Sequence, residues 1–380
     1  MDGVAAALAG TVADAVAGLD TPAVLVDLDR LEVNLRELAA ATASAGVAMR
    51  PHVKTHKIPW IAHRQLELGA VGITCATLRE AEVMTGAGLD DVLLHYPVVG
   101  AAKLRRLAAL RDRARVRLVI DSVEVARGLA TIASPADPIE VLLDVDTGHH
   151  RLGRAPGAPT RDLARAVQAV AGVRVIGVSS HAGHAYAARG PADLAACARA
   201  EVEALRETAA LLEQDGVPAP AVSIGSTPSV RAALAVPGVT EARPGTYAFN
   251  DAAMIRAGVA TEETCAVTVA ATVVSRPAPD RCVIDAGSKA LSSDGVGTPD
   301  WIRVLGRPDL HPAFLSEEHG VLTVDPGGRA PAVGDVLLVV PSHVCPVLNL
   351  ADTVTVLAGG TVVGTLDVEA RGYRAEPRRS

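Results

Sequence analysis

The chain is poor in aromatic residues, which make up 2% of its 380 positions. So few aromatic rings cannot supply stacking platforms for single-stranded nucleic acid, and a formal net charge of −7 offers no basic surface to a phosphate backbone. The five cysteines are odd in number and widely scattered, which excludes a disulfide framework and favours a reducing cytoplasm. No apolar run approaches the roughly 18–20 residues of a membrane-spanning helix. We therefore expect a soluble protein without nucleic-acid or membrane partners.

Apolar residues account for 49% of the chain, so a sizeable core is expected, and Ala, Val and Leu must fill it. From residue 21 to about residue 251, short apolar runs alternate with stretches in which apolar residues recur three and four apart. Eight such strand–helix units favour a closed (β/α)8 barrel of the TIM type, with a doubly wound open sheet as the alternative. The predicted barrel covers residues 21–253. Its predicted strands cover residues 47–52, 71–76, 92–96, 116–120, 139–145, 173–180, 221–224 and 240–243.

The helical period disappears after residue 254. Val- and Thr-rich runs such as "CAVTVAATVVS" and "DTVTVLAGG" follow, punctuated by Gly, Pro and Asp. This texture predicts a second, mostly-β domain over residues 254–380. Residues 1–20 are Ala-rich and lack a basic region, so we expect a short helix there rather than a signal peptide, and this helix is a candidate to pack on the β domain.

Polar residues gather where the predicted strands end. "RPHVKTHK" (residues 50–57) closes the first strand, "DVDTGHHRLG" (144–153) the fifth and "SSHAGHAY" (179–186) the sixth. "IGSTPS" (224–229) and "EARPGTYAFND" (241–251) close the last two. In a barrel these strand ends meet at one face, where catalytic residues are found.

The loops after the last two strands have the composition of a phosphate site. Each offers small residues, free backbone N–H groups and hydroxyls, although each could also be an ordinary turn. Together with a lysine after the first strand, a phosphate site indicates pyridoxal phosphate, whose aldehyde needs an amine and whose phosphate needs an anchor. The candidate phosphate residues are Gly225, Ser226, Thr227, Gly245, Thr246 and Tyr247.

Three further residues have both a functional and a structural interpretation. Arg151 could hydrogen-bond the phenolic oxygen of the cofactor or form a surface salt bridge. His181 and Tyr186 follow the sixth strand, and could flank the cofactor ring or be buried polar residues with satisfied hydrogen bonds. The sequence leaves these alternatives open.

The ordered set of motifs resembles a known family. "VDTGHHRLG" resembles a motif of the alanine racemase barrel. With "RPHVKTHK", "HAGHAY", "GSTPS", "RPGTYAFND", "DAGSKALSSD", "SEEHG" and "PSHVCPVLNL", it resembles the D-serine dehydratase and D-threonine aldolase family of fold-type III pyridoxal-phosphate enzymes. The resemblance spans about residues 21–370 and implies an alanine racemase-like barrel followed by a β domain.

The resemblance implies that Lys54, the first lysine of "RPHVKTHK", forms the Schiff base, and that Arg151 contacts the cofactor oxygen. Period-two alternation would place His52, Lys54 and His56 on one face of an extended segment, with Lys57 opposite. We therefore expect His52 and His56 to line the same pocket as Lys54.

"PSHVCPV" places His343 and Cys345 two residues apart, and in extended backbone their side chains would point the same way. Two ligands alone are a weak motif, but the resemblance implies a catalytic metal here. Imidazole with thiolate suits zinc, and manganese or magnesium is the alternative. In this family, aldolases typically carry Asp at the second position and dehydratases carry Cys.

Cys345 thus points to the dehydratase branch. The expected function is a pyridoxal-phosphate- and zinc-dependent lyase acting on β-hydroxy D-amino acids, most simply converting D-serine into pyruvate and ammonia. The alternative is a D-threonine aldolase, which cleaves its substrate to glycine and an aldehyde. The resemblance also implies a homodimer.

Overall fold

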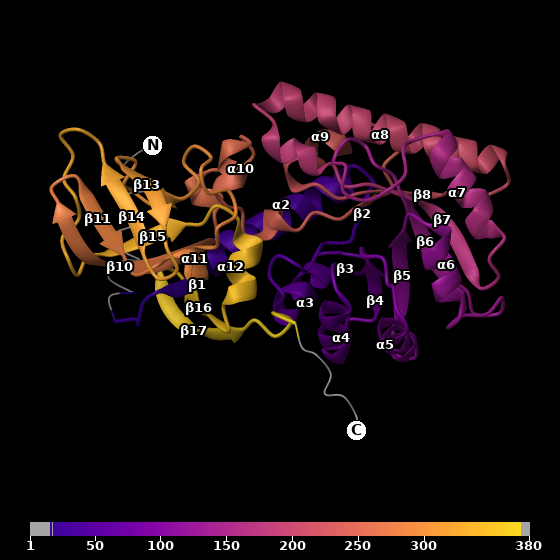
Figure 1. The fold of residues 1–380 in the computed structure, drawn as a ribbon, viewed down its shortest axis with the longest axis horizontal. Coiled ribbons are helices and arrows are strands. Elements are labelled where there is room, and N and C mark those ends of the chain that lie inside the picture. The colour runs from indigo at the N-terminus through magenta and orange to yellow at the C-terminus, as the bar shows by residue number, and fades with distance from the viewer. Residues whose placement is uncertain (1–15, 17, 374–380) are drawn as a thin grey trace. The chain divides into compact units, whose positions relative to one another are not determined.

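The computed structural model describes residue 16 and residues 18–373. The chain divides into two compact units, both drawn in Figure 1. The barrel unit comprises Arg36–Lys54 and Pro59–Gly245, and the β unit comprises the residues up to Leu35, Thr55–Ile58 and Thr246–Gly372. Most of the helix expected over residues 1–20 lies outside the described residues. None of the helices in the described residues combines the length and the apolarity needed to cross a bilayer.

A parallel eight-stranded sheet forms the barrel unit, in the order β2-β9-β8-β7-β6-β5-β4-β3 (Figure 1). Backbone hydrogen bonds from Val71 N to Met49 O (2.8 Å) and from Thr74 N to Pro51 O (2.8 Å) join the two ends of this order and close the ring. The predicted (β/α)8 barrel is confirmed, and every predicted strand overlaps an observed one. The strands are β2 (Ala48–Met49), β3 (Ile73–Cys75), β4 (Asp91–Leu94), β5 (Arg115–Ile120), β6 (Ile139–Asp144), β7 (Val173–Ser179), β8 (Ala221–Ile224) and β9 (Glu241–Ala242).

Helices alternate with these strands because apolar residues recur at helical spacing between them. In α6, for example, Val125, Ala126 and Leu129 are buried and charged residues lie elsewhere on the helix. The helices of this unit are α3 (Pro59–Glu67), α4 (Leu78–Gly86), α5 (Ala101–Arg111), α6 (Val123–Ala130), α7 (Ala158–Gln168), α8 (Pro191–Gln214) and α9 (Thr227–Leu234), with the 3-10 turn η1 (Gly183–Ala187) after β7.

Ion pairs fill the end of the barrel where the strands begin. Leu93 and Leu142 line a cavity there together with charged side chains. Arg50 is 3% exposed and donates to Asp91 (2.5 Å) and to Glu241 (2.7 Å). A buried guanidinium is tolerated because carboxylates pair with it. This end is therefore occupied by internal ion pairs, which leaves the opposite end for chemistry.

Gly177 in β7 permits a close approach of two strands. The register of β7 against β6 shifts between Val175 and Gly177. A β-carbon on Gly177 would overlap the backbone carbonyl of Ala221 at the start of β8.

We expect Gly177→Ala to lower the free energy of unfolding by about 2–4 kcal/mol, measured by urea unfolding. Gly86→Ala is the matched control: nothing lies within 4 Å of its β-carbon, so stability should hold or rise. Equal stability of the two variants would contradict the close approach.

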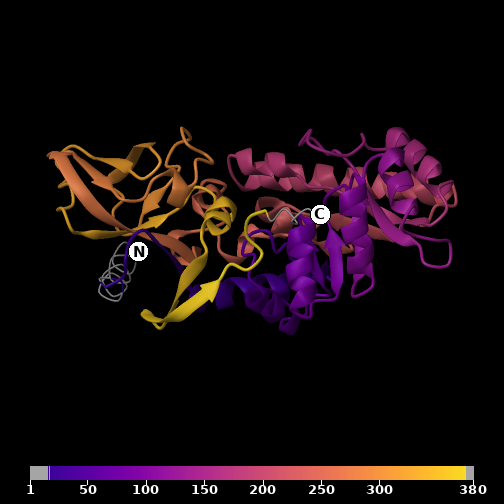
Figure 2. The same cartoon turned by 60° about the horizontal axis from the view of Figure 1, so that its bottom comes forward.

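A nine-stranded mixed sheet forms most of the β unit, in the order β13-β14-β11-β10-β1-β16-β17, with β15 paired to β10 and β12. Its last hairpin, β16–β17, is drawn in yellow in Figure 2. The predicted mostly-β second domain is confirmed. The strands are β1 (Ala23–Asp27), β10 (Val267–Ala278), β11 (Arg281–Ile284), β12 (Arg303–Val304), β13 (Leu310–Leu315), β14 (Gly320–Val324), β15 (Val336–Val340), β16 (Thr353–Ala358) and β17 (Thr361–Asp367). The helical segments are η2 (Thr246–Ala248), α10 (Ala252–Arg256), η3 (Glu262–Thr264), α11 (Ser288–Leu291) and α12 (Val344–Leu350).

The first strand joins the β unit rather than the barrel. Leu25 of β1 pairs with Thr268 of β10 and with Thr355 of β16. The bounds drawn from the sequence start the barrel at residue 21 and end it at residue 253, whereas the compact units assign the residues up to Leu35 and those from Thr246 onward to the β unit. β1 is a short apolar strand followed by an amphipathic helix, α2 (Leu28–Ser44). This sequence pattern is the same whether the strand joins the barrel sheet or the sheet of the β unit, so the pattern does not assign the strand to either.

Candidate active site

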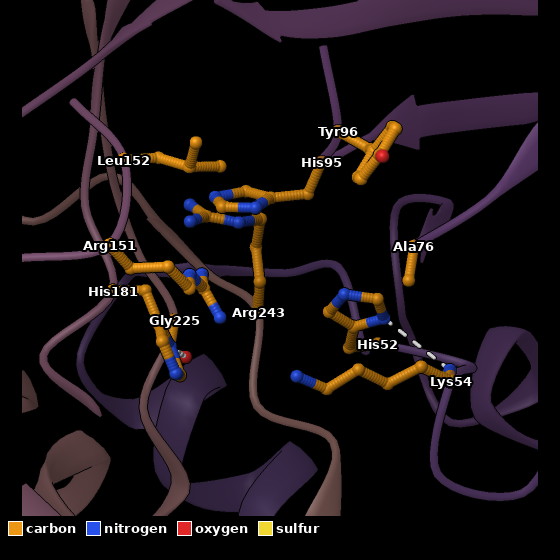
Figure 3. A pocket seen from close by; sticks show the side chains of 10 residues that line it. All are labelled: His52, Lys54, Ala76, His95, Tyr96, Arg151, Leu152, His181, Gly225 and Arg243. Carbon is orange, nitrogen blue, oxygen red and sulfur yellow. Dashed lines mark hydrogen bonds between the residues drawn. The ribbon is translucent and has the colours of Figure 1, made fainter. Parts of the chain in front are cut away.

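A cavity of about 310 Å³ lies at the carboxyl ends of the barrel strands. Seven of the eight strands contribute to it through the residues that follow them. Figure 3 shows the side chains that line it. They are His52, Lys54, Ala76, His95, Tyr96, Arg151, Leu152, His181, Gly225 and Arg243.

Lys54 extends its side chain into this cavity beside His52 (Figure 3). The backbone N–H of Lys54 donates to His52 Nδ1 (3.4 Å), so the proton of the neutral imidazole is on Nε2. Burial, followed by the charge of Lys54, lowers the pKa of His52 well below its usual value. Lys54 therefore faces a neutral imidazole.

The chain turns after His52, so the expected extended segment does not form. Residues 53–56 form a turn, which breaks the period-two alternation. His56 is not among the cavity-lining residues; it is buried, and its Nδ1 accepts a hydrogen bond from Ile58 N (3.1 Å). The expectation that His56 shares the pocket with His52 is thus wrong. Lys57 has a positive φ of 58° at the end of the turn.

The cavity presents cations and neutral imidazoles. His181 Nδ1 donates to Gly225 O, and burial, followed by the charge of Lys54, lowers its pKa well below the usual value. Arg151 forms no ion pair in the described part of the chain, so the surface salt bridge considered from the sequence is not present. None of the described lining residues is acidic. The charge of the cavity therefore suits an anionic ligand.

Arg243 and His95 are cavity residues that the sequence analysis missed. Arg243 is 2% exposed, and its guanidinium donates to Ser180 O (2.9 Å) and to Ser223 Oγ. Burial, followed by the charge of Arg243, lowers the pKa of His95. Both residues had a sequence signal, namely a polar side chain at the carboxyl end of a predicted strand. His95 lies at the end of the predicted third strand and Arg243 at the end of the predicted eighth, but neither belongs to a motif that the sequence analysis identified.

The start of α9 has the features of a phosphate site. Ser226 is the N-cap of α9, but its side chain makes no capping hydrogen bond. The hydroxyls of Ser226 and Ser229 are buried and find no partner among the described residues. Gly225 lets Arg243 approach, since a β-carbon there would lie 3.0 Å from Nη2. An anion would satisfy the orphaned hydroxyls and the free N–H groups of the helix terminus, so these residues fit a phosphate group.

The remaining cofactor candidates are not brought to the cavity wall. Tyr186 lies in η1 and is absent from the lining residues. Gly245 ends the barrel unit, and Thr246 and Tyr247 begin the β unit in η2. Their roles as cofactor contacts stay predictions, as does that of Thr227, which follows Ser226 as the first residue of α9.

Asp144 is a buried carboxylic acid at the end of β6. It accepts a hydrogen bond from Ser179 Oγ (3.1 Å), and burial raises its pKa from 3.8 to about 6. Because the folded-state pKa lies above the unfolded one, the contribution of Asp144 to stability is most favourable below about pH 4 and is lost as pH rises through about 6. Asp144→Asn should therefore raise the free energy of unfolding at pH 8 by about 1–3 kcal/mol and change it little at pH 4. Urea unfolding at both pH values measures this; a pH-independent difference would contradict it.

His343 and Cys345 interact within the β unit although the backbone is not extended through both residues. His343 is the N-cap of α12 and is itself extended, but Cys345 is the second residue of that helix, so the extended segment considered from the sequence does not form. Burial lowers the pKa of His343, but the charge of Cys345 and hydrogen bonds to Asp294 and Cys345 raise it well above its usual value. A metal ion could replace the proton that this imidazole and thiolate share, so the pair fits a zinc ion.

The pair supplies only two donors. Within the described residues, no group of three or more His, Cys, Asp or Glu side chains is arranged to hold a metal ion. Catalytic zinc sites keep positions open for water and substrate, whereas structural sites are closed by protein ligands. The pair would therefore leave further positions of a bound ion to be filled by other ligands.

Comparison with known proteins identifies the family. The N-terminal domain of alanine racemase matches residues 26–253, and a putative serine dehydratase domain matches residues 266–357. The D-threonine aldolase of Arthrobacter sp is 35% identical over 365 residues, which cover 95% of each chain. The D-threo-3-hydroxyaspartate dehydratase of Delftia sp. (strain HT23) is 36% identical over 359 residues, covering 87% of this chain and 92% of that enzyme.

Similar solved structures identify the same family. The crystal structure of D-threonine aldolase from Filomicrobium marinum has a TM-score of 0.86 at 36% identity, over 93% of this chain and 96% of that one. The D-threo-3-hydroxyaspartate dehydratase has also been solved with a histidine replaced by alanine and, in a metal-free form, with a cysteine replaced by alanine. The chain described here therefore belongs to the D-serine dehydratase and D-threonine aldolase family, pyridoxal-phosphate lyases built on an alanine racemase-like barrel.

Proposed function

We propose that this protein is a pyridoxal-phosphate- and zinc-dependent dehydratase of β-hydroxy D-amino acids, with D-serine as the simplest substrate and pyruvate and ammonia as its products. The observation that carries the choice of reaction is the identity of the pair, a histidine and a cysteine two positions apart at His343 and Cys345. Family membership alone does not decide between dehydration and retro-aldol cleavage, because similar proteins include both aldolases and dehydratases.

The donor types support the dehydratase. In the family, a cysteine at the second metal position accompanies dehydration, and Cys345 occupies that position. In the Delftia dehydratase, the histidine and the cysteine that were replaced stand two positions apart, as His343 and Cys345 do, and the cysteine variant was solved free of metal. Imidazole and thiolate together prefer zinc over the harder manganese and magnesium ions.

The barrel residues would divide the work around the cofactor. Bound pyridoxal phosphate supplies an aldehyde for a lysine and a ring that accepts the electron pair of the substrate α-carbon. Lys54 Nζ would hold the cofactor and, once the substrate amine displaces it, would take the proton from the α-carbon. Arg151 would donate to the phenolic oxygen, and Ser226 with the N-terminus of α9 would bind the phosphate.

The β unit would assist the leaving group. Hydroxide is a poor leaving group, and His343 and Cys345 would hold a zinc ion that would supply Lewis acidity to it.

Retro-aldol cleavage is the second candidate, since two of the similar proteins are D-threonine aldolases. The test is to incubate the purified enzyme with pyridoxal phosphate, zinc and either D-serine, D-threonine or D-threo-3-hydroxyaspartate, and to identify the products by mass. A 2-oxo acid with ammonia supports the dehydratase. Glycine with an aldehyde, and no ammonia, would replace it with the aldolase.

Ser226→Ala should weaken the binding of pyridoxal phosphate by roughly tenfold or more, because hydrogen bonds to a charged group contribute about 1.5–3 kcal/mol. The fold should not lose stability, since the Ser226 hydroxyl has no partner among the described residues. Titration of the apoenzyme with the cofactor, followed by absorbance, measures the dissociation constant. Ser226→Thr keeps the hydroxyl and should restore binding. Unchanged affinity in Ser226→Ala would remove this residue from the phosphate site.

A homodimer and a cytoplasmic location complete the proposal. Both rest on the family resemblance and on the scattered cysteines, none of which forms a disulfide within the described residues. Light scattering of the purified protein would check the dimer, and a monomeric mass would contradict it.

A further inference from the structure

Each of the two candidate metal ligands has a hydrogen-bond partner on its side chain, and the Cys345 sulfur has a second, longer contact to Thr246 Oγ1 (4.0 Å). Asp294 Oδ2 lies 3.1 Å from His343 Nδ1, and Thr55 Oγ1 lies 3.2 Å from Cys345 Sγ. We propose that Asp294 and Thr55 are positioning residues of the metal site, an inference that rests on the function proposed above. Asp294 fixes the tautomer and orientation of the His343 ring. Thr55 donates a hydrogen bond to the Cys345 sulfur and so fixes its position.

Asp294 acts on the imidazole. A carboxylate facing Nδ1 accepts its proton, so that Nε2 carries the lone pair that a metal requires. Ligating histidines commonly have such a carboxylate behind them, which orients the ring and raises its basicity. The contact thus has the chemistry of an outer partner of the metal site, although the Asp294 side chain is 59% exposed.

The loop that carries Asp294 is built to reach His343. Asp294 N donates to Ser292 Oγ (3.1 Å), which folds the loop back after α11. Gly295 follows with a positive φ of 79°, and a β-carbon there would overlap the hydroxyl of Ser342, the residue before His343. A glycine at this position therefore lets the loop pack directly against the segment that carries the metal pair.

Thr55 acts on the thiolate. Its side chain is fully buried, at 0% exposure, so the hydroxyl must use a protein partner. A thiolate has no proton to donate, and the threonine hydroxyl is then the donor in this pair. Thr55 directly follows Lys54 in the sequence, so one short segment supplies both the cofactor lysine and the partner of the metal-binding sulfur.

Asp251 holds the backbone between the two donors independently of Asp294 and Thr55. Its Oδ1 accepts from Met254 N (3.0 Å) and its Oδ2 accepts from Val344 N (3.0 Å), which joins α10 to the start of α12. Substitutions at Asp294 and Thr55 should therefore alter the side chains of the metal pair without releasing the backbone that carries them.

The experiment measures zinc and cobalt affinity of the pyridoxal-phosphate-loaded enzyme by competition with a chelator. Asp294→Ala should weaken zinc binding by roughly 10- to 100-fold, as loss of such outer partners does elsewhere. Asp294→Asn keeps an acceptor oxygen and should lose less. Asp300→Asn is the matched control, because this exposed acid of the same loop region pairs with Arg303 instead and should leave affinity unchanged.

Thr55→Val removes the hydroxyl at nearly constant volume. We expect a shift of the thiolate-to-cobalt charge-transfer band and a roughly tenfold weaker cobalt affinity, both restored by Thr55→Ser. The absorbance of the lysine-bound cofactor should stay unchanged in all these variants, which separates a metal-site effect from a general loss of structure.

Two results would overturn the inference. Wild-type zinc affinity in both Asp294→Ala and Thr55→Val would mean that the contacts position nothing. A loss in Asp294→Ala as large as that in His343→Ala would make Asp294 a direct ligand. Failure of the wild-type enzyme to bind either metal would instead refute the proposed function, so the two failures are distinguishable.

Discussion

Lys54→Ala should abolish turnover and the visible absorbance band of the lysine-bound cofactor. The side chain of Lys54 is the one amine among the described residues that line the barrel cavity. Its loss removes both the covalent attachment and the base for the α-proton, so activity should fall by at least about 10³-fold. Spectra of the purified variant mixed with pyridoxal phosphate, together with an ammonia assay, measure the two effects.

The neighbouring lysine provides the control. Lys57→Arg keeps the charge at a buried position three residues away but cannot form an imine. This variant should retain the band and most of the activity. Loss of the band in Lys57→Arg but not in Lys54→Ala would transfer the cofactor to Lys57 and end the assignment of the pocket.

Removal of the metal should abolish most of the catalytic activity while the cofactor stays bound. We expect a chelator to reduce activity by at least about 100-fold, because Lewis-acid assistance contributes several kcal/mol to the departure of hydroxide, and added zinc to restore it. His343→Ala should show the same loss without recovery on adding zinc.

A histidine elsewhere in the β unit serves as the matched control for His343. His311 Nε2 pairs with Asp325 Oδ1 (3.0 Å) at the surface, and His311→Ala should keep its activity and its zinc. Full activity of a protein shown by elemental analysis to be free of metal would end the metal proposal, while the assignment of Lys54 would stand.

The fold was readable from the sequence because its periodicity is local. Mostly apolar runs of four to eight residues separated by amphipathic stretches recur eight times, and parallel strands buried on both faces have this pattern wherever they occur. The gathering of polar residues at strand ends followed directly, since all parallel strands of a barrel end at the same face. His52, Lys54, Arg151, His181 and Gly225 accordingly line one cavity.

The positions of residues that depend on long-range contacts could not be predicted from the sequence. Arg243 enters the cavity because Ser180 and Ser223, from two other strands, hold its guanidinium. His56 leaves the pocket because the chain turns after His52, and a turn competes with extended backbone only through its tertiary surroundings. The orphaned hydroxyl of Ser226 is likewise a property of burial, which the sequence does not display.

The sequence by itself determined the barrel and the β domain that follows it, because residue identity and short-range period suffice for these, whereas the metal candidates rested on the family resemblance. Only the tertiary structure decided that β1 belongs to the β unit and that Asp294 and Thr55 meet His343 and Cys345. Asp294 stands 49 positions from His343, and Thr55 stands 290 positions from Cys345. Separations of this size carry no periodic signal, so strand pairing and packing alone bring such partners together.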